Sequence, residues 1–143
     1  MTSKSDDNNS SAADDAVRRH YETLPYPARD PKDEARRLIA GSPSHILEID
    51  HYLFAGKRDW SKPFRALIAG GGTGDAAIML AQQLADCGAR AEIHYLDMSS
   101  AARAVAQARA QARKLTTLAF HAGSLLDLPT MGLGKFDYID CTG

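Results

Sequence analysis

Hydrophobic and polar positions divide the chain near residue 63. The first 14 residues (MTSKSDDNNSSAAD) carry almost no large hydrophobic side chains, so they cannot bury enough surface to offset the entropy lost on ordering. We predict a disordered tail over 1–14. Residues 15–62 are predicted to form an N-terminal helical segment, with a short helix over 15–23 and an extended stretch at the prolines of 25–27.

Two further helices are predicted inside this N-terminal segment. Asp30 followed by Pro31 is typical of a helix start with Asp30 as the N-cap, and this helix should run to about Ala40. Ser42-Pro43 should open the next helix, whose hydrophobic positions are Ile46, Leu47, Ile49, Leu53 and Phe54. The residues over 56–62 are then predicted to form a linker.

From residue 63 onward, short hydrophobic runs alternate with helical periodicity. The runs predict buried strands, and hydrophobic residues spaced by three and four predict helices between them. The predicted elements are strands over 65–69, 91–96, 115–121 and 136–139, with helices over 75–85 and 100–114. Strands alternating with helices indicate an α/β fold with a mostly parallel sheet and right-handed crossovers.

A glycine-rich turn follows the first predicted strand. Gly70, Gly72 and Gly74 stand at alternate positions and end at a predicted helix start, where free backbone N–H groups favour polar or anionic ligands. The dinucleotide fingerprint G-x-G-x-x-G does not fit, because its third glycine would fall on Asp75. A carboxylate there favours a positively charged or zwitterionic ligand over a pyrophosphate.

Asp97 ends the second predicted strand. A carboxylate at that position is placed to accept hydrogen bonds from the two hydroxyls of a ribose. Together with the glycine turn, it predicts a ligand that contains a nucleoside and needs no pyrophosphate. Plainer interpretations are a structural strand-to-helix turn for the glycines and a helix N-cap for Asp97, a role for which Ser99 competes.

At these residues the chain resembles the class I S-adenosylmethionine-dependent methyltransferases. The segments that carry the resemblance are RALIAGGGTGD over 65–75, YLDMSSAARA over 95–104, FHAGSLLDLP over 120–129 and FDYIDCTG over 136–143. The upstream YETLPYP over 21–27 is similar to the Y-x-x-x-P-Y-P segment of one subgroup. The resemblance implies a Rossmann-like sheet that contains the strand order 3-2-1-4, with an N-terminal helical extension.

The resemblance also implies roles for individual residues. Gly70, Gly72 and Gly74 would line the methionine part of S-adenosyl-L-methionine, and Asp97 would hold its ribose. Met98 would pack on the adenine face, Ser124 and Leu125 would contact the adenine edge, and Cys141 with Thr142 would lie beside the reactive methyl group. No general base is assigned, because sulfonium activation leaves much of the catalysis to positioning and desolvation.

Composition and charge narrow the classes of function. The 17 basic and 18 acidic residues give a net charge of −1, which argues against non-specific nucleic-acid binding. No hydrophobic run reaches the roughly 18 residues of a membrane span, and no secretory signal is visible, so the cytoplasm is the expected compartment. Cys87 and Cys141 form no disulfide framework, and the histidines show no metal spacing.

Methyl transfer to an acceptor that is a small molecule, a protein or RNA is therefore the expected function. One alternative is a non-catalytic S-adenosylmethionine-binding fragment or regulatory module, and a more remote one is a nicotinamide-dependent oxidoreductase. The 143 residues provide four of the seven strands that the family implies. We therefore expect 63–143 to be the N-terminal part of a methyltransferase domain, and we expect self-association through the exposed edge of the fourth strand.

Overall fold

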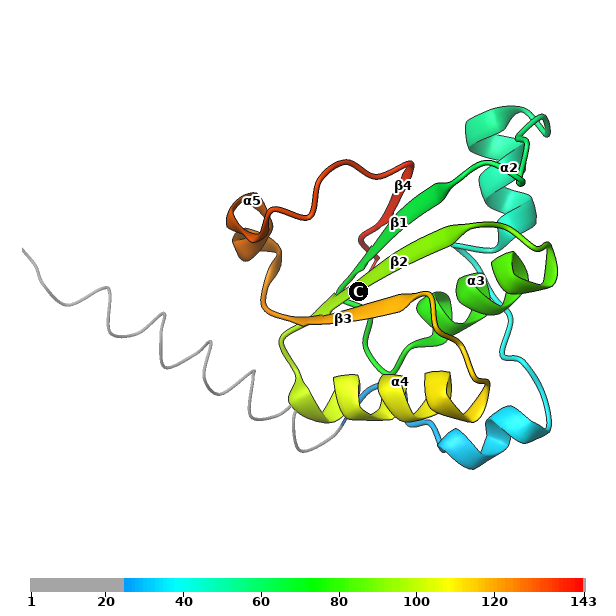
Figure 1. The fold of residues 1–143 in the computed structure, drawn as a ribbon. Coiled ribbons are helices and arrows are strands. Elements are labelled where there is room, and N and C mark those ends of the chain that lie inside the picture. Colours follow the sequence, from blue (N-terminus) through cyan, green and yellow to red (C-terminus); the bar gives the residue numbers. More distant parts are fainter. Residues whose placement is uncertain (1–24, 143) are drawn as a thin grey trace, which may run out of the picture.

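The computed structural model describes residues 25–142, so the tail over 1–14, the helix over 15–23 and most of the segment over 21–27 lie outside the described residues. The chain forms a four-stranded sheet in the order β3-β2-β1-β4 (Figure 1). The strands are β1 (Phe64–Ala69), β2 (Ala91–Asp97), β3 (Leu118–Ala122) and β4 (Tyr138–Asp140). Every pairing is parallel, which confirms the Rossmann-like α/β fold.

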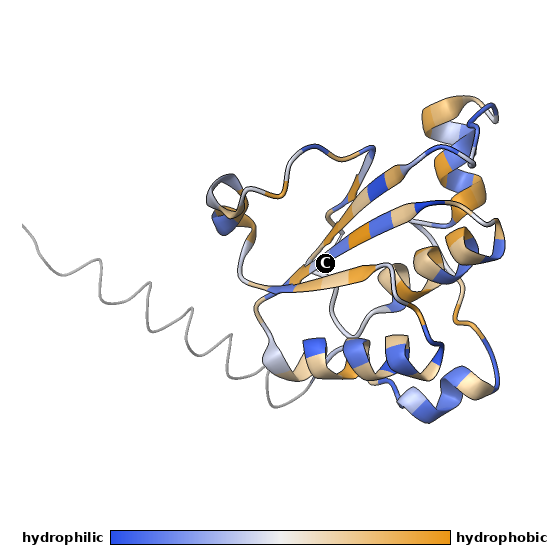
Figure 2. Ribbon diagram, in the orientation of Figure 1, coloured by the Kyte–Doolittle hydropathy of each residue, from blue (hydrophilic) through white to orange (hydrophobic). Residues whose placement is uncertain are grey.

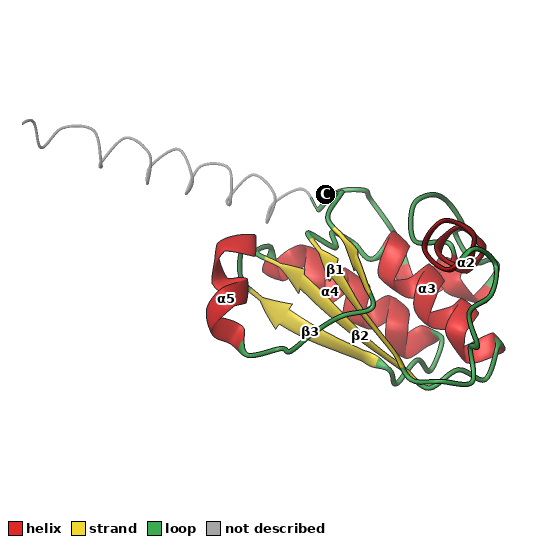
Figure 3. Ribbon diagram, turned by 90° about the horizontal axis from the view of Figure 1, so that it is seen from above, coloured by secondary structure: helices red, strands yellow, loops and turns green. Residues whose placement is uncertain are grey.

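Helices α3 (Asp75–Asp86) and α4 (Ser100–Ala112) pack on the same face of the sheet (Figure 3). They enclose the main core, in which Phe64, Leu80 and Ile93 are fully buried. Helix α2 (Ile46–Phe54) extends this core through Ile46 and Ile49. Hydrophobic burial of this kind contributes roughly 25 cal/mol per Å² of apolar surface.

The opposite face of the sheet carries a smaller core. Leu67, Ala69 and Leu96 are covered by Leu128 and Met131 of the short helix α5 (Leu128–Met131) and by Phe136. The 3₁₀ helix η2 (Leu125–Asp127) directly precedes α5. Hydrophilic positions interrupt the hydrophobic strands (Figure 2). Two of them are His94 and His121, which are hydrogen-bonded to each other at 2.7 Å on this face.

The predicted helix over 31–40 is wrong beyond its first turns. Asp30 is the N-cap as predicted, but the element is the 3₁₀ helix η1 (Pro31–Ala35). The chain then leaves the helical path, because its backbone bonds to side chains of other elements. The Arg37 carbonyl accepts from Arg113 of α4 at 2.8 Å, and the Gly41 N–H donates to the Met79 sulfur at 3.3 Å. Tertiary contacts here override helix propensity.

Other element boundaries shift by a few residues. Helix α2 begins at Ile46 rather than at Ser42-Pro43, with the His45 side chain as its cap. Helix α4 ends at Ala112 rather than at Lys114, which takes a positive φ of 57°. The third strand accordingly begins at Leu118, and the fourth runs from Tyr138 to Asp140 instead of starting at Phe136.

Candidate functional site

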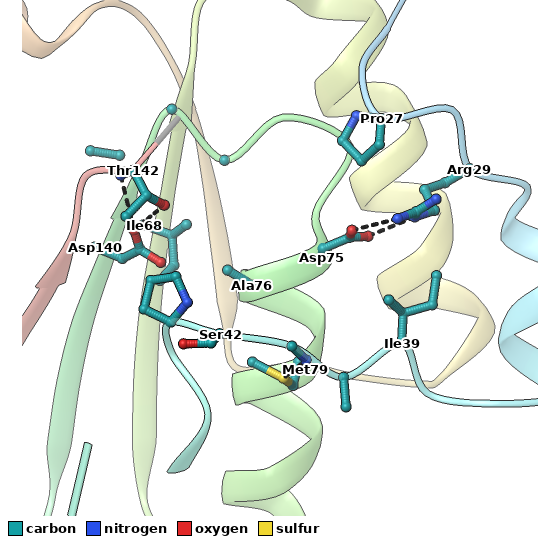
Figure 4. A pocket seen from close by; sticks show the side chains of 16 residues that line it. Pro27, Arg29, Ile39, Ser42, Ile68, Asp75, Ala76, Met79, Asp140 and Thr142 are labelled. Atoms are coloured by element: carbon teal, nitrogen blue, oxygen red, sulfur yellow. Dashed lines mark hydrogen bonds and ion pairs between the residues drawn. The ribbon is translucent and has the colours of Figure 1, made fainter. Parts of the chain in front are cut away.

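The carboxyl ends of the parallel strands meet at one edge of the sheet, where β1 lies between β2 and β4. Open α/β sheets bind ligands outside such a point of reversal in strand order. A pocket of about 400 Å³ opens there (Figure 4). Its sheet wall comprises Ile68, Ala69, Gly70, Gly71, Asp75, Ala76, Met79, Asp140 and Thr142. Its N-terminal wall comprises Pro27, Arg29, Ile39, Ala40, Gly41, Ser42 and Pro43.

The glycine turn joins β1 to α3, and the Tyr95 side chain packs against it. The Tyr95 hydroxyl donates to the Gly72 carbonyl at 2.5 Å, and a Cβ at Gly71 would overlap the Tyr95 ring. Burial raises the pKa of Tyr95, so this hydroxyl keeps its proton and acts as the donor. The turn is therefore held in one conformation by a fully buried aromatic side chain.

The three predicted glycines have different surroundings. Gly70 lines the pocket, whereas Gly72 and Gly74 do not. A Cβ at Gly72 would come within 2.9 Å of the Tyr26 carbonyl oxygen, and one at Gly74 would come within 3.0 Å of Ala106 of α4. Gly74 also serves as the N-cap of α3 with a φ of 107°, a conformation that favours glycine. Close packing thus requires Gly72 and Gly74 in this turn.

Asp97 lies against the same turn. Its Oδ2 accepts from the Gly72 N–H and its Oδ1 from the Ser99 N–H, each at 2.8 Å. A carboxylate has about four acceptor positions, so each oxygen keeps one for a ligand hydroxyl. Ser99 is the N-cap of α4, which decides the competition for that role, and Met98 beside it is 44% exposed.

Ser124 and Leu125 follow β3, at the start of η2. The Ser124 hydroxyl accepts from the Leu126 N–H at 3.2 Å, and the Asp127 carboxylate accepts from the Ser124 N–H at 2.7 Å. This capping box fixes the turn after β3, and Leu125 remains 48% exposed. Asp97, Met98, Ser124 and Leu125 do not line the pocket, which lies on the β1–β4 side of the turn.

Asp75 has its positive partners within the chain. Arg29 donates two hydrogen bonds to it, from Nε to Oδ1 at 2.8 Å and from Nη2 to Oδ2 at 2.7 Å. Arg109 donates a further one to Oδ1 at 2.8 Å. Burial alone would raise the pKa of Asp75, but the two arginines outweigh it and hold the pKa below its usual value. Asp75 thus anchors the N-terminal wall to α3 (Figure 4).

Arg109 extends this anchor into the interior. It is fully buried, donates to the Thr73 carbonyl at 3.0 Å, and pairs with Glu34 of η1 at 2.5 Å. Glu34 also pairs with Arg113. The Thr73 hydroxyl donates to the Pro27 carbonyl at 2.5 Å, so charged and neutral bonds together attach the N-terminal wall to the glycine turn.

The fourth strand brings its tip to the pocket. Asp140 and Thr142 line it, and both the Thr142 N–H and its hydroxyl donate to the Asp140 carboxylate. Cys141 is exposed and does not line the pocket. Among residues 25–142 no group of His, Cys, Asp or Glu side chains is arranged to hold a metal ion. No helix in this same range has the length and hydrophobicity needed to span a bilayer.

Comparison with models of protein families shows to which family the chain belongs. A family model described as a methyltransferase domain matches residues 66–143, more than half of the chain. The chain belongs to this methyltransferase family. The match confirms the resemblance to class I S-adenosylmethionine-dependent methyltransferases that the glycine turn, Asp97 and the strand order indicate. A comparison with curated protein sequences finds no match.

Solved structures share the fold of this methyltransferase chain. One, described as the conversion of a disulfide bond into a thioacetal group during echinomycin biosynthesis, is 27% identical with a TM-score of 0.54, over 87% of this chain and 46% of that protein. TrmN from Thermus thermophilus is 20% identical with a TM-score of 0.50, over 78% and 30%. The precorrin-8W decarboxylase of Methanobacterium thermoautotrophicum is 15% identical with a TM-score of 0.50, over 78% and 52%. The chain thus spans about half or less of the length of these proteins.

Sequence reasoning missed two residues that line the pocket, Arg29 and Asp140, and it missed Ser44, which bonds to Asp140. Arg29 belongs to a segment that the family model does not match. An unpaired acid at Asp75 was a signal that an arginine should lie nearby, but several arginines were equally available. Ser44 and Asp140 meet across 96 positions of sequence, a contact for which the sequence carries no local signal.

Proposed function

We propose that this chain binds S-adenosyl-L-methionine at the carboxyl edge of its sheet and provides the cofactor-binding part of a methyltransferase. The observation that supports this most directly is Asp97, held by backbone N–H groups of Gly72 and Ser99 with one acceptor position left on each oxygen. Two neighbouring ribose hydroxyls need two such positions. The family match supports the same cofactor.

The pocket beside Asp97 suits the other end of that molecule. Gly70 and Gly71 line it without side chains, and Arg29 is part of its N-terminal wall. Arg29 would attract the carboxylate of the methionine part, because its guanidinium is 29% exposed and, among residues 25–142, its charge is paired with Asp75 alone. Met98 and Leu125, both partly exposed, would cover the adenine.

S-adenosylmethionine, when bound, supplies an activated methyl group. The residues of the chain would orient it and exclude water, which is where methyl transfer gains most of its rate. The acceptor, whether small molecule, protein or RNA, would approach along the exposed end of β4 near Cys141 and Thr142. No residue is proposed as a general base.

A second candidate is a module that binds the cofactor without turnover. The observation that favours it is coverage, since the chain spans about half or less of the solved structures it matches. Asp75 no longer argues against a dinucleotide, because two arginines offset its charge. The nicotinamide alternative is instead disfavoured by the family match.

Titration calorimetry with S-adenosylmethionine, S-adenosylhomocysteine and NAD tests the proposal. We expect the two adenosyl ligands to bind, NAD to give no heat, and Asp97→Ala to weaken binding by about 10- to 100-fold through loss of charge-assisted hydrogen bonds. Asp86→Asn, on the exposed end of α3, is the matched control and should bind as the wild type does. No binding by the folded wild-type protein would overturn the proposal.

Turnover separates the two candidates. Release of S-adenosylhomocysteine with any member of an acceptor panel would support methyl transfer by this chain. Binding without release across amines, thiols, phenols, peptides and RNA would favour the non-catalytic module.

Self-association remains a proposal as well. On its outer side β4 pairs with no strand of the described chain, and Ile139 is 57% exposed there. Open strand edges invite pairing with a second copy. Sedimentation should show association that rises with concentration and falls in Ile139→Lys, and a monodisperse wild-type monomer would contradict it.

A further inference from the structure

Asp140 is a buried carboxylate in the wall of the candidate cofactor pocket. It is the last residue of β4, its exposed fraction is 4%, and it lies across the pocket from the Asp75–Arg29 pair (Figure 4). Burying a charged group is costly unless hydrogen bonds or an opposite charge compensate for the lost water. The partners of Asp140 therefore show what compensates it.

Those partners are all neutral. The Thr142 N–H and hydroxyl donate to Oδ1 at 3.0 and 2.7 Å, and the Ser44 hydroxyl donates to Oδ2 at 2.5 Å. Within residues 25–142 no Lys, Arg or His forms an ion pair with Asp140. Asp75, the other acid that lines the described part of the pocket, pairs with two arginines. In the described part of the pocket, Asp140 is thus the acid whose charge is not compensated.

Its orientation is fixed by a chain of hydroxyls. Ser44 has one hydroxyl hydrogen, which goes to Asp140, so the contact of 2.7 Å between Ser44 and Tyr138 requires the Tyr138 hydroxyl to donate. Burial raises the pKa of Tyr138, which keeps that hydrogen in place. Ser44 is itself 1% exposed. The carboxylate is therefore held rigidly at the strand tip.

The negative charge of Asp140 is not compensated by a cation of the described chain, but most of its hydrogen-bond acceptor positions are filled. Three of its roughly four acceptor positions are filled, both on Oδ1 and one on Oδ2. An ammonium group carries three N–H donors and is best held by several acceptors. A sulfonium group has no donor hydrogens and interacts with a carboxylate through its charge.

We propose that Asp140 is the counter-charge for the sulfonium of S-adenosylmethionine and makes the pocket prefer the charged cofactor to the neutral product. This inference rests on the proposed function. S-adenosylmethionine and S-adenosylhomocysteine share the ribose, adenine, ammonium and carboxylate, and they differ in the methyl group and the positive charge on sulfur. Asp140 thus lowers the affinity of the product relative to the cofactor, and Ser44 acts as a positioning residue.

Calorimetry of both ligands against wild type and Asp140→Asn tests this. We expect the ratio of the S-adenosylhomocysteine Kd to the S-adenosylmethionine Kd to fall on the order of tenfold in the variant, because a Coulomb interaction with sulfur is removed. The change should come from weaker S-adenosylmethionine binding. Asp86→Asn removes the same charge from the exposed end of α3, outside the pocket, and should leave the ratio unchanged.

Each other outcome has a definite meaning. Equal weakening of both ligands, which leaves the ratio of the two Kd values unchanged, would show that Asp140 serves the shared ammonium and would overturn the inference. Unchanged affinity for both ligands would overturn it as well. Failure of the wild type to bind either ligand would overturn the proposed function itself. If the thermal melt shows that Asp140→Asn does not fold, Asp140→Ser gives the same comparison with a smaller neutral side chain.

Discussion

The two walls of the pocket are built by different physical means. The sheet wall rests on neutral contacts: parallel strand pairing, the Tyr95 ring under Gly71 and helix packing at Gly74. The N-terminal wall is attached largely through charge, by Arg29 on Asp75 and by Glu34 on Arg109. The family model covers every residue of the sheet wall and none of the N-terminal wall. The sheet wall is thus the part shared with the family, and the N-terminal wall is the part on which this chain can differ from its relatives.

The largest effect should come from cutting the charged anchor. Arg109→Ala removes one of the two arginines that pair with the buried Glu34, and removing one member of a buried pair destabilises a protein by about 3–5 kcal/mol. Urea unfolding measures the loss, and proteolysis should cut the N-terminal wall before the sheet. Arg37→Ala, an exposed arginine on the same segment, is the control and should change stability by less than about 0.5 kcal/mol. Equal effects would mean that the anchor is not held by charge.

Filling the glycine turn should disturb the sheet wall. Gly71→Ala places a methyl group into the Tyr95 ring, and such overpacking costs about 1–3 kcal/mol. Gly41→Ala on the opposite wall has nothing within 4 Å of its Cβ and should be nearly neutral. Paired thermal melts compare the two, and a similar loss in both would contradict the role given to Tyr95.

Arg29 should matter more for binding than for stability. Its ion pair with Asp75 is partly exposed, so Arg29→Ala should cost at most about 1 kcal/mol of stability. Binding of S-adenosylhomocysteine should weaken on the order of tenfold, because the positive charge that faces the ligand carboxylate is lost. Lys32→Ala, which changes an exposed cation of η1 outside the pocket, is the control. Unchanged affinity in Arg29→Ala would remove the N-terminal wall from the cofactor site.

The smallest effect concerns acid stability. The pKa of Asp75 is lowered in the folded chain, so its contribution is present above its unfolded pKa and is lost as the pH falls through the folded value. Asp75→Asn should therefore flatten the decline in unfolding free energy below about pH 4. Asp86→Asn, which forms no ion pair within the described chain, should leave the decline unchanged. A steeper decline in Asp75→Asn would contradict a lowered pKa for Asp75 in the folded chain.

The sequence was sufficient to predict the sheet wall of the pocket and insufficient to predict the N-terminal wall. Strands, the glycine turn and Asp97 leave local patterns, since hydrophobic runs and glycine spacing arise from neighbouring residues. The predicted helix to Ala40 failed because Arg113 and Met79, distant in sequence, capture its backbone. Ser44 and Asp140 likewise met through the fold. Contacts between polar or charged side chains that are far apart in the sequence leave no local pattern from which they could be predicted.

Hydrogen exchange, with and without S-adenosylhomocysteine, tests most directly whether both walls form one cofactor site. We predict slower exchange of backbone amides at the glycine turn over 70–75, at 97–99, and on the N-terminal wall over 39–42. Protection of the turn alone would show that the N-terminal wall does not take part. No protection at the turn or at 97–99, in a protein that binds the ligand, would contradict the site proposed for this chain.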